Sequence, residues 1–285
     1  MNYRHAFHAG NFADVMKHAV LALILRHLGA KPAPYCVLDT HAGTGRYDLA
    51  SGPSTRTGEA ERGIVRLMRE RAALPPDLSP YLEAVEALNA GGGLRHYPGS
   101  PRLARALMRP QDRLVLAELH PEDAAALKRE FAHDRQAAVH HMDGYLALKA
   151  HLPPAERRGL VLVDPPFETP DEFDQLVAGL ALAHRRWPAG IKALWYPIKD
   201  RPAVWRFHDA LEASGVPRIL LAELTIHRED THQRLNGSGM VLVNPPWRLD
   251  GTLATVLPAL HAALGAEEGG ARVEWLVPEQ AAPTP

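Results

Sequence analysis

Strand and helix patterns alternate along most of this chain, and this alternation constrains the fold more than any other feature of the sequence. Short apolar runs rich in β-branched residues predict strands, and apolar residues recurring every three to four positions predict helices. The expected strands include residues 35–39, 114–119, 137–142, 159–164 and 191–196, and the expected helices include 13–28, 121–131 and 203–213. This order predicts an α/β protein with a mostly parallel seven-stranded sheet and helices on both of its faces.

The composition excludes several classes of protein. The chain has 285 residues, of which 46% are hydrophobic and 23% charged, and its formal net charge is −1. It is therefore not a generally basic nucleic-acid-binding protein, although a local basic site is compatible with this total. No apolar run is long enough to span a bilayer and no signal-peptide core is present, so we expect a cytoplasmic protein without a membrane partner. The 16 histidines and one cysteine show no metal-ligand spacing, so we expect no metal site.

One stretch breaks the alternation. About 75 residues separate the glycine loop near Gly43 from the acidic strand end at Glu118, whereas a simple βαβ unit places its acidic residue about 20 residues on. We therefore expect an inserted helical subdomain at 47–95, and a main domain made of 1–46 and 96–285. The insert could recognise the substrate or could merely cover one edge of the sheet, and the sequence does not choose between them.

Four of the predicted strands end in polar residues. They are Asp39-Thr40-His41-Ala42-Gly43-Thr44-Gly45, Glu118, Asp143-Gly144 and Asp164-Pro165-Pro166-Phe167. Ligands of open α/β sheets bind at the carboxyl ends of parallel strands, so these groups should meet at one edge. The glycine loop lacks the spacing of a dinucleotide fingerprint or a P-loop. The set instead suits a nucleoside without a pyrophosphate, such as S-adenosylmethionine.

The fourth strand end suits a second planar ligand. Pro165 and Pro166 fix the backbone and lack N–H groups, so the carbonyls of this turn are stiff acceptors. Beside them, Asp164 offers a carboxylate and Phe167 a flat ring. This combination favours a base that carries an exocyclic amino group.

These motifs together resemble those of Rossmann-like class I methyltransferases that act on amino groups. The resemblance is closer to the bacterial 23S rRNA adenine-N6 methyltransferases of the RlmJ type, and it extends up to about Glu279. The blocks that carry it include Tyr3-Arg4-His5-Ala6-Phe7-His8-Ala9-Gly10-Asn11, Lys17-His18, Leu38-Asp39-Thr40-His41-Ala42-Gly43, Arg56-Thr57-Gly58-Glu59, Tyr97-Pro98-Gly99-Ser100-Pro101, Glu118-Leu119-His120-Pro121 and Ala193-Leu194-Trp195-Tyr196-Pro197. One departure is Phe167, where the family commonly has tyrosine.

The resemblance implies a set of roles. Asp164 would be catalytic, and Tyr3 would contact the RNA together with Pro165 and Phe167. The substrate would be adenine 2030 of 23S rRNA, either protein-free or at an early stage of assembly, and a monomer is the default expectation. The residues that would bind S-adenosylmethionine are His18, His41, Ser100, Glu118, Asp143 and Gly144.

A second motif, Asn244-Pro245-Pro246-Trp247, competes with Asp164-Pro165-Pro166-Phe167. We expect Asn244 to end an antiparallel strand, which would point away from the ligand edge, so we favour Asp164. A DNA adenine methyltransferase or a protein glutamine methyltransferase would share the acceptor motif, usually with asparagine at its first position. A non-catalytic rRNA-binding assembly factor with a vestigial cofactor pocket is the alternative from another class.

Overall fold

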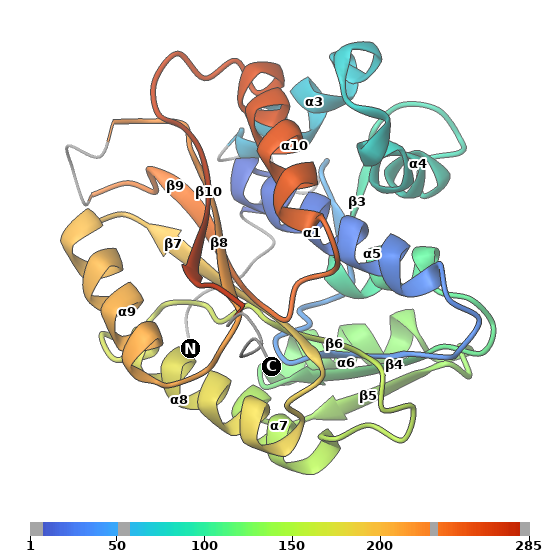
Figure 1. The fold of residues 1–285 in the computed structure, drawn as a ribbon. Coiled ribbons are helices and arrows are strands. Elements are labelled where there is room, and N and C mark those ends of the chain that lie inside the picture. The colour runs from blue at the N-terminus through green and yellow to red at the C-terminus, as the bar shows by residue number, and fades with distance from the viewer. Residues whose placement is uncertain (1–7, 51–57, 229–232, 280–285) are drawn as a thin grey trace.

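The computed structural model describes residues 8–50, 58–228 and 233–279. Its main sheet has eight strands in the order β10-β8-β9-β7-β6-β1-β4-β5, with helices on both faces (Figure 1). Five neighbouring strands are parallel: β7 (Ile191–Ile198), β6 (Gly159–Val163), β1 (Cys36–Asp39), β4 (Arg113–Glu118) and β5 (Ala137–His141). The mostly parallel sheet predicted from the sequence is therefore confirmed.

The number of strands in the sheet was predicted wrongly, because the sheet has eight strands and not seven. β9 (Gly237–Val243) is antiparallel to both β7 and β8 (Ile219–Thr225). β10 (Gly270–Val277) then pairs with β8 from Gly270 to Val277 and becomes the eighth strand, at the edge. This pairing gives the outer backbone groups of β8 partners within the protein.

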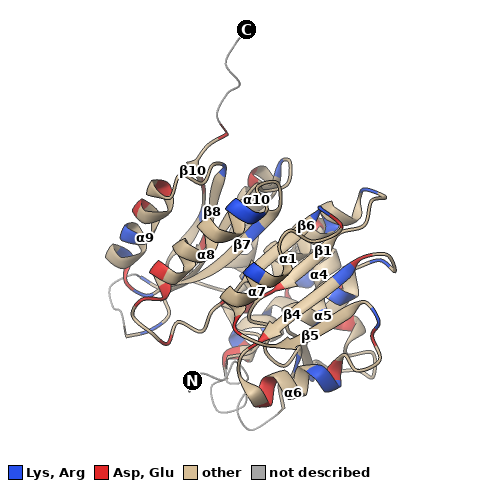
Figure 2. Ribbon diagram, turned by 90° about the horizontal axis from the view of Figure 1, so that it is seen from below, with Lys and Arg blue, Asp and Glu red and all other residues tan. Residues whose placement is uncertain are grey.

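Charged residues of both signs are spread over many elements of the fold (Figure 2). Many of them form surface ion pairs, such as Arg113 with Glu156 and Arg105 with Asp134. Exposed pairs of this kind contribute about 0–1 kcal/mol each, so the fold depends mainly on its apolar core. No described helix is long and apolar enough to cross a membrane.

The core forms two layers, one on each face of the sheet. The first layer holds α1 (Phe12–Gly29), α5 (Ser100–Leu107) and α10 (Leu249–Ala263), and the second holds α7 (Gly144–His151), α8 (Glu172–Arg186) and α9 (Arg201–Ala213). α6 (Pro121–Glu130) flanks β4 and β5.

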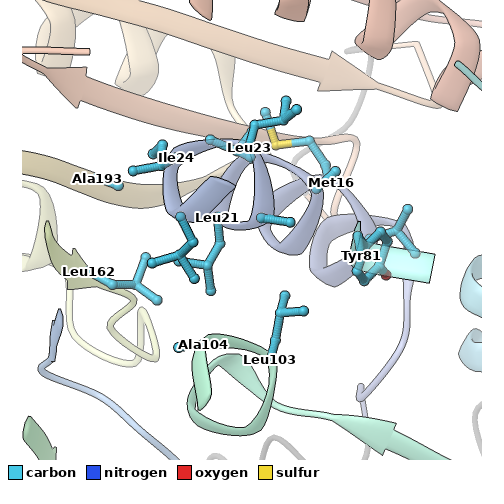
Figure 3. Close-up of a cluster of buried hydrophobic side chains, with 14 of the residues drawn as sticks. Met16, Leu21, Leu23, Ile24, Tyr81, Leu103, Ala104, Leu162 and Ala193 are labelled. Carbon is cyan, nitrogen blue, oxygen red and sulfur yellow. The ribbon is translucent and has the colours of Figure 1, made fainter. Parts of the chain in front are cut away.

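Helix α1 lies at the centre of the first layer, and 14 of its 18 residues are buried. Figure 3 shows Leu21 and Ile24 of this helix among side chains from other elements, including Leu103 of α5 and Leu162 of β6. Burying a leucine or isoleucine stabilises the fold by about 1.5–3 kcal/mol. Asn11 is the N-cap of the helix, because its side chain accepts a 3.0 Å hydrogen bond from Asp14 N. This packing fixes the start of α1 against the sheet.

The stretch between β1 and β4 contains short helical segments and a two-stranded ribbon. β2 (Arg46–Asp48) pairs with β3 (His96–Pro98), and between them lie η2 (Glu61–Val65), α3 (Arg66–Arg69), η3 (Arg71–Ala73), η4 (Pro76–Leu78) and α4 (Ser79–Ala87). Their buried residues Ile64, Leu67 and Tyr81 belong to the same apolar cluster as α1. The stretch therefore shares the main core, and the division at 47–95 stays a prediction.

A glycine explains how this stretch approaches α1. Gly63 has a non-helical backbone, with φ −102 and ψ −109, at a kink between helical turns. A Cβ there would lie 2.0 Å from the carbonyl oxygen of Gly10, so only glycine allows the contact. The amide of Ile64 then donates a 2.8 Å hydrogen bond to Gly10 O. The kink joins the stretch to the start of α1, beside the candidate site.

Candidate active site

The four polar strand ends meet at one edge of the sheet. β6, β1, β4 and β5 are neighbours and run in the same direction, so the residues after Val163, Asp39, Glu118 and His141 lie side by side. Because the connections after these strands all start at this edge, segments far apart in the sequence line one region. The sequence predicted this convergence, and the pairing of the strands confirms it.

A cavity of about 270 Å³ lies at this edge. All six residues that the resemblance implies for the cofactor line it: His18, His41, Ser100, Glu118, Asp143 and Gly144. They come from α1, from the loop after β1, from α5, from β4 and from the start of α7. The fold thus brings together residues separated by more than 100 positions in the chain.

Glu118 is held by the backbone of two loops. Gly43 N donates a 2.8 Å hydrogen bond to one carboxylate oxygen, and His120 N donates a 2.7 Å bond to the other. Burial raises the pKa of this carboxyl above its usual value. Each carboxylate oxygen has a second lone pair, so Glu118 can still accept bonds from a diol in the cavity.

Asp39 organises the loop after β1. Its carboxylate is 1% exposed and accepts a 2.7 Å bond from Ser100 Oγ and a 3.3 Å bond from His41 N. Burial raises the pKa of Asp39 to about 7. Asp39 therefore joins the loop after β1 to the first turn of α5, and Ser100 is fixed beside the cavity.

His41 is neutral at pH 7 and its tautomer follows from its neighbours. Burial lowers the pKa of His41 to about 4. Its Nδ1 lies 2.8 Å from Thr40 Oγ1, and that hydroxyl donates a 3.0 Å bond to Leu162 O. Since the hydroxyl hydrogen is used there, the ring donates through Nδ1, which leaves Nε2 as an acceptor.

Asp143 and Gly144 form the start of α7. Asp143 is the N-cap of this helix, and its Oδ1 accepts a 2.8 Å bond from Leu146 N. A Cβ on Gly144 would lie 2.4 Å from Thr40 O and 2.8 Å from a ring carbon of His41. The absence of a side chain therefore lets α7 pack directly against the loop after β1.

His18 closes the opposite wall of the cavity. Its Nδ1 lies 2.7 Å from the hydroxyl of Tyr97, and its ring stacks on Tyr97 with 5.3 Å between centroids. Tyr97 in turn bonds the hydroxyl of Tyr81 over 3.0 Å. The side chain of His18 is thus fixed by residues of β3 and α4.

The chemistry of the lining fits S-adenosylmethionine. Carboxylates of Glu118 and Asp143 supply acceptors for a ribose diol and for an adenine amino group, and the Nε2 of His41 adds another acceptor. The hydroxyl of Tyr145 and Oε2 of Glu172, both from residues that line the cavity, are buried and have no protein partner. Unsatisfied polar atoms indicate a polar ligand more than an apolar one. No three His, Cys, Asp or Glu side chains of the described residues gather as they would around a metal ion.

Asp164 lies at the end of β6 and is fixed by a buried lysine. Lys17 Nζ donates to Asp164 Oδ2 and also forms a 3.0 Å ion pair with Asp14 Oδ1. Burial alone would lower the pKa of Lys17, but the charges of Asp14 and Asp164 outweigh it and raise the pKa above its usual value. Lys17 is therefore an ammonium ion between two carboxylates. Asp14 is fixed in turn by a 2.9 Å bond from Gly10 N.

Phe167 is held in a strained conformation beside Asp164. Its φ of 51° lies in the left-handed region, which is uncommon for a bulky residue. Its ring contacts Phe173 at 5.1 Å and Trp195 at 5.6 Å between centroids, both edge to face. Such strain is found where the surrounding structure enforces a functional geometry.

A larger cavity of about 850 Å³ opens on the other side of the Asp-Pro-Pro segment. Asp164, Pro165 and Pro166 line both cavities, and Phe167 lines only the larger one. The larger cavity is also lined by Trp195 at β7 and by Arg62 and Arg66 in the stretch between β1 and β4. The segment therefore forms the wall between two binding spaces.

Tyr3 and Asn244 were also singled out from the sequence. Tyr3 falls outside the described residues. Asn244 follows β9, at the opposite edge of the sheet, and its Nδ2 donates to Pro188 O at 2.6 Å and to Gly190 O at 3.0 Å. The antiparallel direction predicted for its strand is confirmed.

The positions of Lys17 and Trp195 in this site were not predicted from the sequence. Lys17 is 147 residues from Asp164 and contacts it only through the packing of α1 on the sheet. One signal was available, because Asp14 and Lys17 are three residues apart in a helix that is otherwise mostly apolar. A charged pair on a buried helix face indicates a functional partner. Trp195, which lies 5.8 Å below Lys17 Nζ, belonged to a recognised block but received no role.

The family described as "Ribosomal RNA large subunit methyltransferase D, RlmJ" matches residues 32–277. Two relatives named ribosomal RNA large subunit methyltransferase J are similar over their whole length. The one from Escherichia coli strain K12 is 46% identical over 280 residues, covering 98% of this chain and 100% of the relative. The one from Haemophilus influenzae is 44% identical over 281 residues, with the same coverage.

A solved structure has the same fold. The protein LPL1258 of Legionella pneumophila superposes with a TM-score of 0.87 at 31% identity. The superposition covers 94% of this chain and 98% of that protein.

Proposed function

The chain belongs to the RlmJ family of ribosomal RNA large subunit methyltransferases, and from this premise we propose that it methylates the exocyclic N6 of one adenine in 23S rRNA. Its methyl donor is S-adenosylmethionine. The family resemblance suggests adenine 2030 as the target. The observation that carries the proposal is the position of Asp164-Pro165-Pro166 between the two cavities.

The smaller cavity would hold the cofactor through its strand-end acids. Glu118 would accept bonds from the ribose hydroxyls, and Asp143 would accept a bond from the adenine amino group. Gly144 and His41 line the same cavity as these two carboxylates. Ser100 and His18 would contact the amino acid end of S-adenosylmethionine. S-adenosylmethionine supplies the activated methyl group when bound.

The Asp-Pro-Pro segment would orient the target nitrogen. N6 of adenine is a poor nucleophile because its lone pair is delocalised into the ring. Asp164 Oδ1 and the carbonyl of Pro165 would each accept one of its N–H bonds and hold the lone pair toward the cofactor cavity. Lys17 donates to Oδ2. None of the described residues donates to Oδ1, so Oδ1 is available to the substrate. Alignment in a site shielded from water would supply most of the acceleration.

The larger cavity would hold the target base. Phe167 would stack against the adenine ring, which is worth about 1–3 kcal/mol for a base on an aromatic side chain. The base must be unpaired or flipped out to reach Asp164. After transfer, N6 carries one proton too many, and that proton passes to Asp164 or to water. Replacing the family's usual tyrosine by Phe167 removes only a hydroxyl and keeps this stacking.

Other properties follow from an rRNA substrate. We place the protein in the cytoplasm, where bacterial ribosomes assemble, and we propose that it acts as a monomer on 23S rRNA that is protein-free or at an early stage of assembly. The stretch 47–95 would contribute to substrate recognition, because Glu59, Arg62 and Arg66 line the larger cavity.

The test is a methylation assay on protein-free 23S rRNA from a strain that lacks this protein. We expect one N6-methyladenine, mapped by mass spectrometry of nuclease fragments. Ribosomal RNA from the parent strain is the control and should accept almost no methyl groups, because its target is already modified. Methylation at another atom, at many adenines, or only in duplex DNA would contradict the proposal.

A further inference from the structure

The amino ends of the parallel strands, on the side of the sheet away from the candidate site, carry a row of exposed cations. We refer to this side as the opposite edge. The residues are Arg248 after β9, Arg185 and Arg186 before β7, Arg157 before β6 and Lys31 before β1. These strands are neighbours in the order β9-β7-β6-β1. With strands 4.7–4.9 Å apart, the row is at least about 15 Å long. We call these five residues the distal basic row.

The charges of the row are not neutralised by the protein. Within the described part of the chain, none of the five side chains forms a salt bridge. Three carboxylates at this edge are neutralised by other arginines: Asp112 pairs with Arg109, Glu156 with Arg113 and Glu279 with Arg218. Asp250 accepts a 3.1 Å bond from the neutral Trp275 Nε1 and keeps its charge, so the five cations outnumber it. The edge is therefore locally positive although the whole chain has a net charge of −1.

The loops that carry the row are bonded to one another. Arg186 Nε donates a 2.9 Å bond to Leu152 O, and Arg158 donates to Ala33 O and Leu28 O. Asn244 and the buried Lys192 both donate to carbonyls of the loop 187–190. The row thus stands on a rigid platform, which lowers the entropy lost when a ligand binds.

Backbone strain is concentrated at the same edge. Of the five non-glycine residues with positive φ in the described ranges, one is Phe167 at the candidate active site. The other four, Arg157, Arg218, Asn244 and Arg248, lie at this edge. Strained residues persist where the surrounding structure enforces them, and they cluster at functional sites.

An exposed aromatic ring accompanies the cations. Trp247 is 83% exposed, more than any other large hydrophobic residue of the described chain. It lies between Asn244 and Arg248, in the second Pro-Pro motif. An aromatic side chain beside cations is the combination with which proteins bind RNA, where bases stack on the ring and phosphates contact the charges.

We propose that the distal basic row and Trp247 form a second RNA-binding surface. It binds the phosphate backbone of the substrate RNA at a part of the RNA distant from the methylated adenine. The inference rests on the proposed function only in taking RNA as the substrate. β7 has eight residues and runs from this edge to the larger cavity, so the two surfaces are roughly 25 Å apart. Only an RNA long enough to pass around the molecule can reach both.

The test compares a long and a short substrate. The variant Lys31→Gln with Arg185→Gln removes two charges that make no ion pair. On full-length 23S rRNA we expect about a tenfold higher KM at unchanged kcat. The slope of log(kcat/KM) against log salt concentration should become shallower by about 1.4–1.8, since each lost phosphate contact changes it by about 0.7–0.9. On a short RNA that holds only the target adenine and its neighbours, both constants should stay at the values of the unmodified protein.

Trp247→Ala separates stacking from charge. It should raise the KM for 23S rRNA without changing the salt slope, because no ion pair is lost. The matched control is Lys128→Gln with Arg206→Gln, which removes two exposed charges from α6 and α9, outside the row. This control should leave the KM for both RNAs unchanged.

Three results would overturn the proposal. The first is an unchanged KM and salt slope for Lys31→Gln with Arg185→Gln. The others are an equal rise of KM in the control variant, or an equal rise of KM on the short RNA. If the unmodified protein methylates neither RNA, the proposed function fails by itself. Filter binding of 23S rRNA to the same variants then still decides whether the row binds RNA.

Discussion

Asp39 shows how the burial of one carboxylate affects the cofactor site. It is almost fully buried, it accepts bonds from Ser100 and His41, and burial raises its pKa to about 7. In the unfolded chain an aspartate has a pKa of about 3.9. Between these two values the folded protein binds a proton that the unfolded chain has already lost.

This difference predicts a pH dependence of stability. The free energy of unfolding should fall as the pH rises from about 4 to about 7 and should then level off. The total fall is up to about 4 kcal/mol, because the pKa of Asp39 is raised by about three pH units. Asp39→Asn keeps an acceptor for Ser100 and removes the charge. The variant should therefore be more stable than the unmodified protein at pH 8, and the difference should shrink toward pH 4. Urea denaturation across this range measures it, and a difference that is constant with pH would contradict the prediction.

Single residues of the site differ in how far the sequence predicts their positions. The positions of Glu118, Asp143 and Asp164 could be predicted because each follows a recognisable strand, and strand direction alone decides where such residues meet. Lys17 could not, because its contact with Asp164 depends on how α1 packs against β6. The raised pKa of Asp39 could not be predicted from the sequence either, because it follows from burial and not from residue type.

At the scale of elements, the local patterns predicted strands better than helix ends. Ser100 begins α5 but donates its hydroxyl hydrogen to Asp39. The stretch 58–73 has a continuous helical pattern, yet the structure breaks it at Gly63. The pattern of side chains does not report the close contact with Gly10 that requires this kink. Tertiary contacts of this kind override local preference.

The start of α7 gives a prediction about an element. Gly144→Ala places a methyl group 2.4 Å from Thr40 O, a backbone atom that cannot move without shifting the loop after β1. We expect a loss of stability of about 1–3 kcal/mol, as for other overpacked sites, and at least tenfold weaker binding of S-adenosylmethionine. Calorimetric titration and thermal unfolding measure these effects.

Gly251→Ala is the matched control, because Gly251 lies in α10 and a Cβ there meets nothing within 4 Å. It should stabilise the protein by up to about 1 kcal/mol and leave cofactor affinity unchanged. Equal effects of the two substitutions would refute the steric explanation.

At the scale of the whole molecule, the order of strands favours Asp164 over Asn244 as the proposed catalytic residue. Asp164 follows a parallel strand and lies between the two cavities, whereas Asn244 follows an antiparallel strand at the opposite edge. The tetrapeptides are similar, so the motif alone does not identify the site. The sequence did predict the antiparallel pair, and this prediction was sufficient to choose between the motifs. The sequence also predicted a last strand, at residues 273–277, but a sheet of seven strands, whereas β10 makes the sheet eight-stranded.

Asn244→Ala tests this distinction. The variant loses two hydrogen bonds to Pro188 O and Gly190 O. Its free energy of unfolding should therefore be about 1–3 kcal/mol lower. Its kcat on a short RNA substrate should equal that of the unmodified protein. A hundredfold loss of kcat in a folded Asn244→Ala protein would mean that the second motif takes part in catalysis.

The most direct test of the account is methyl transfer by Asp164→Ala, measured together with its affinity for S-adenosylmethionine. Lys17 keeps Asp14 as an ion-pair partner in this variant, so the site should stay folded. We predict that calorimetry gives a cofactor affinity within about twofold of the unmodified protein, whereas kcat on 23S rRNA falls by a factor of about 10² or more, the usual loss when one transition-state contact is removed. Near-normal turnover by Asp164→Ala would contradict the assignment of the acceptor site.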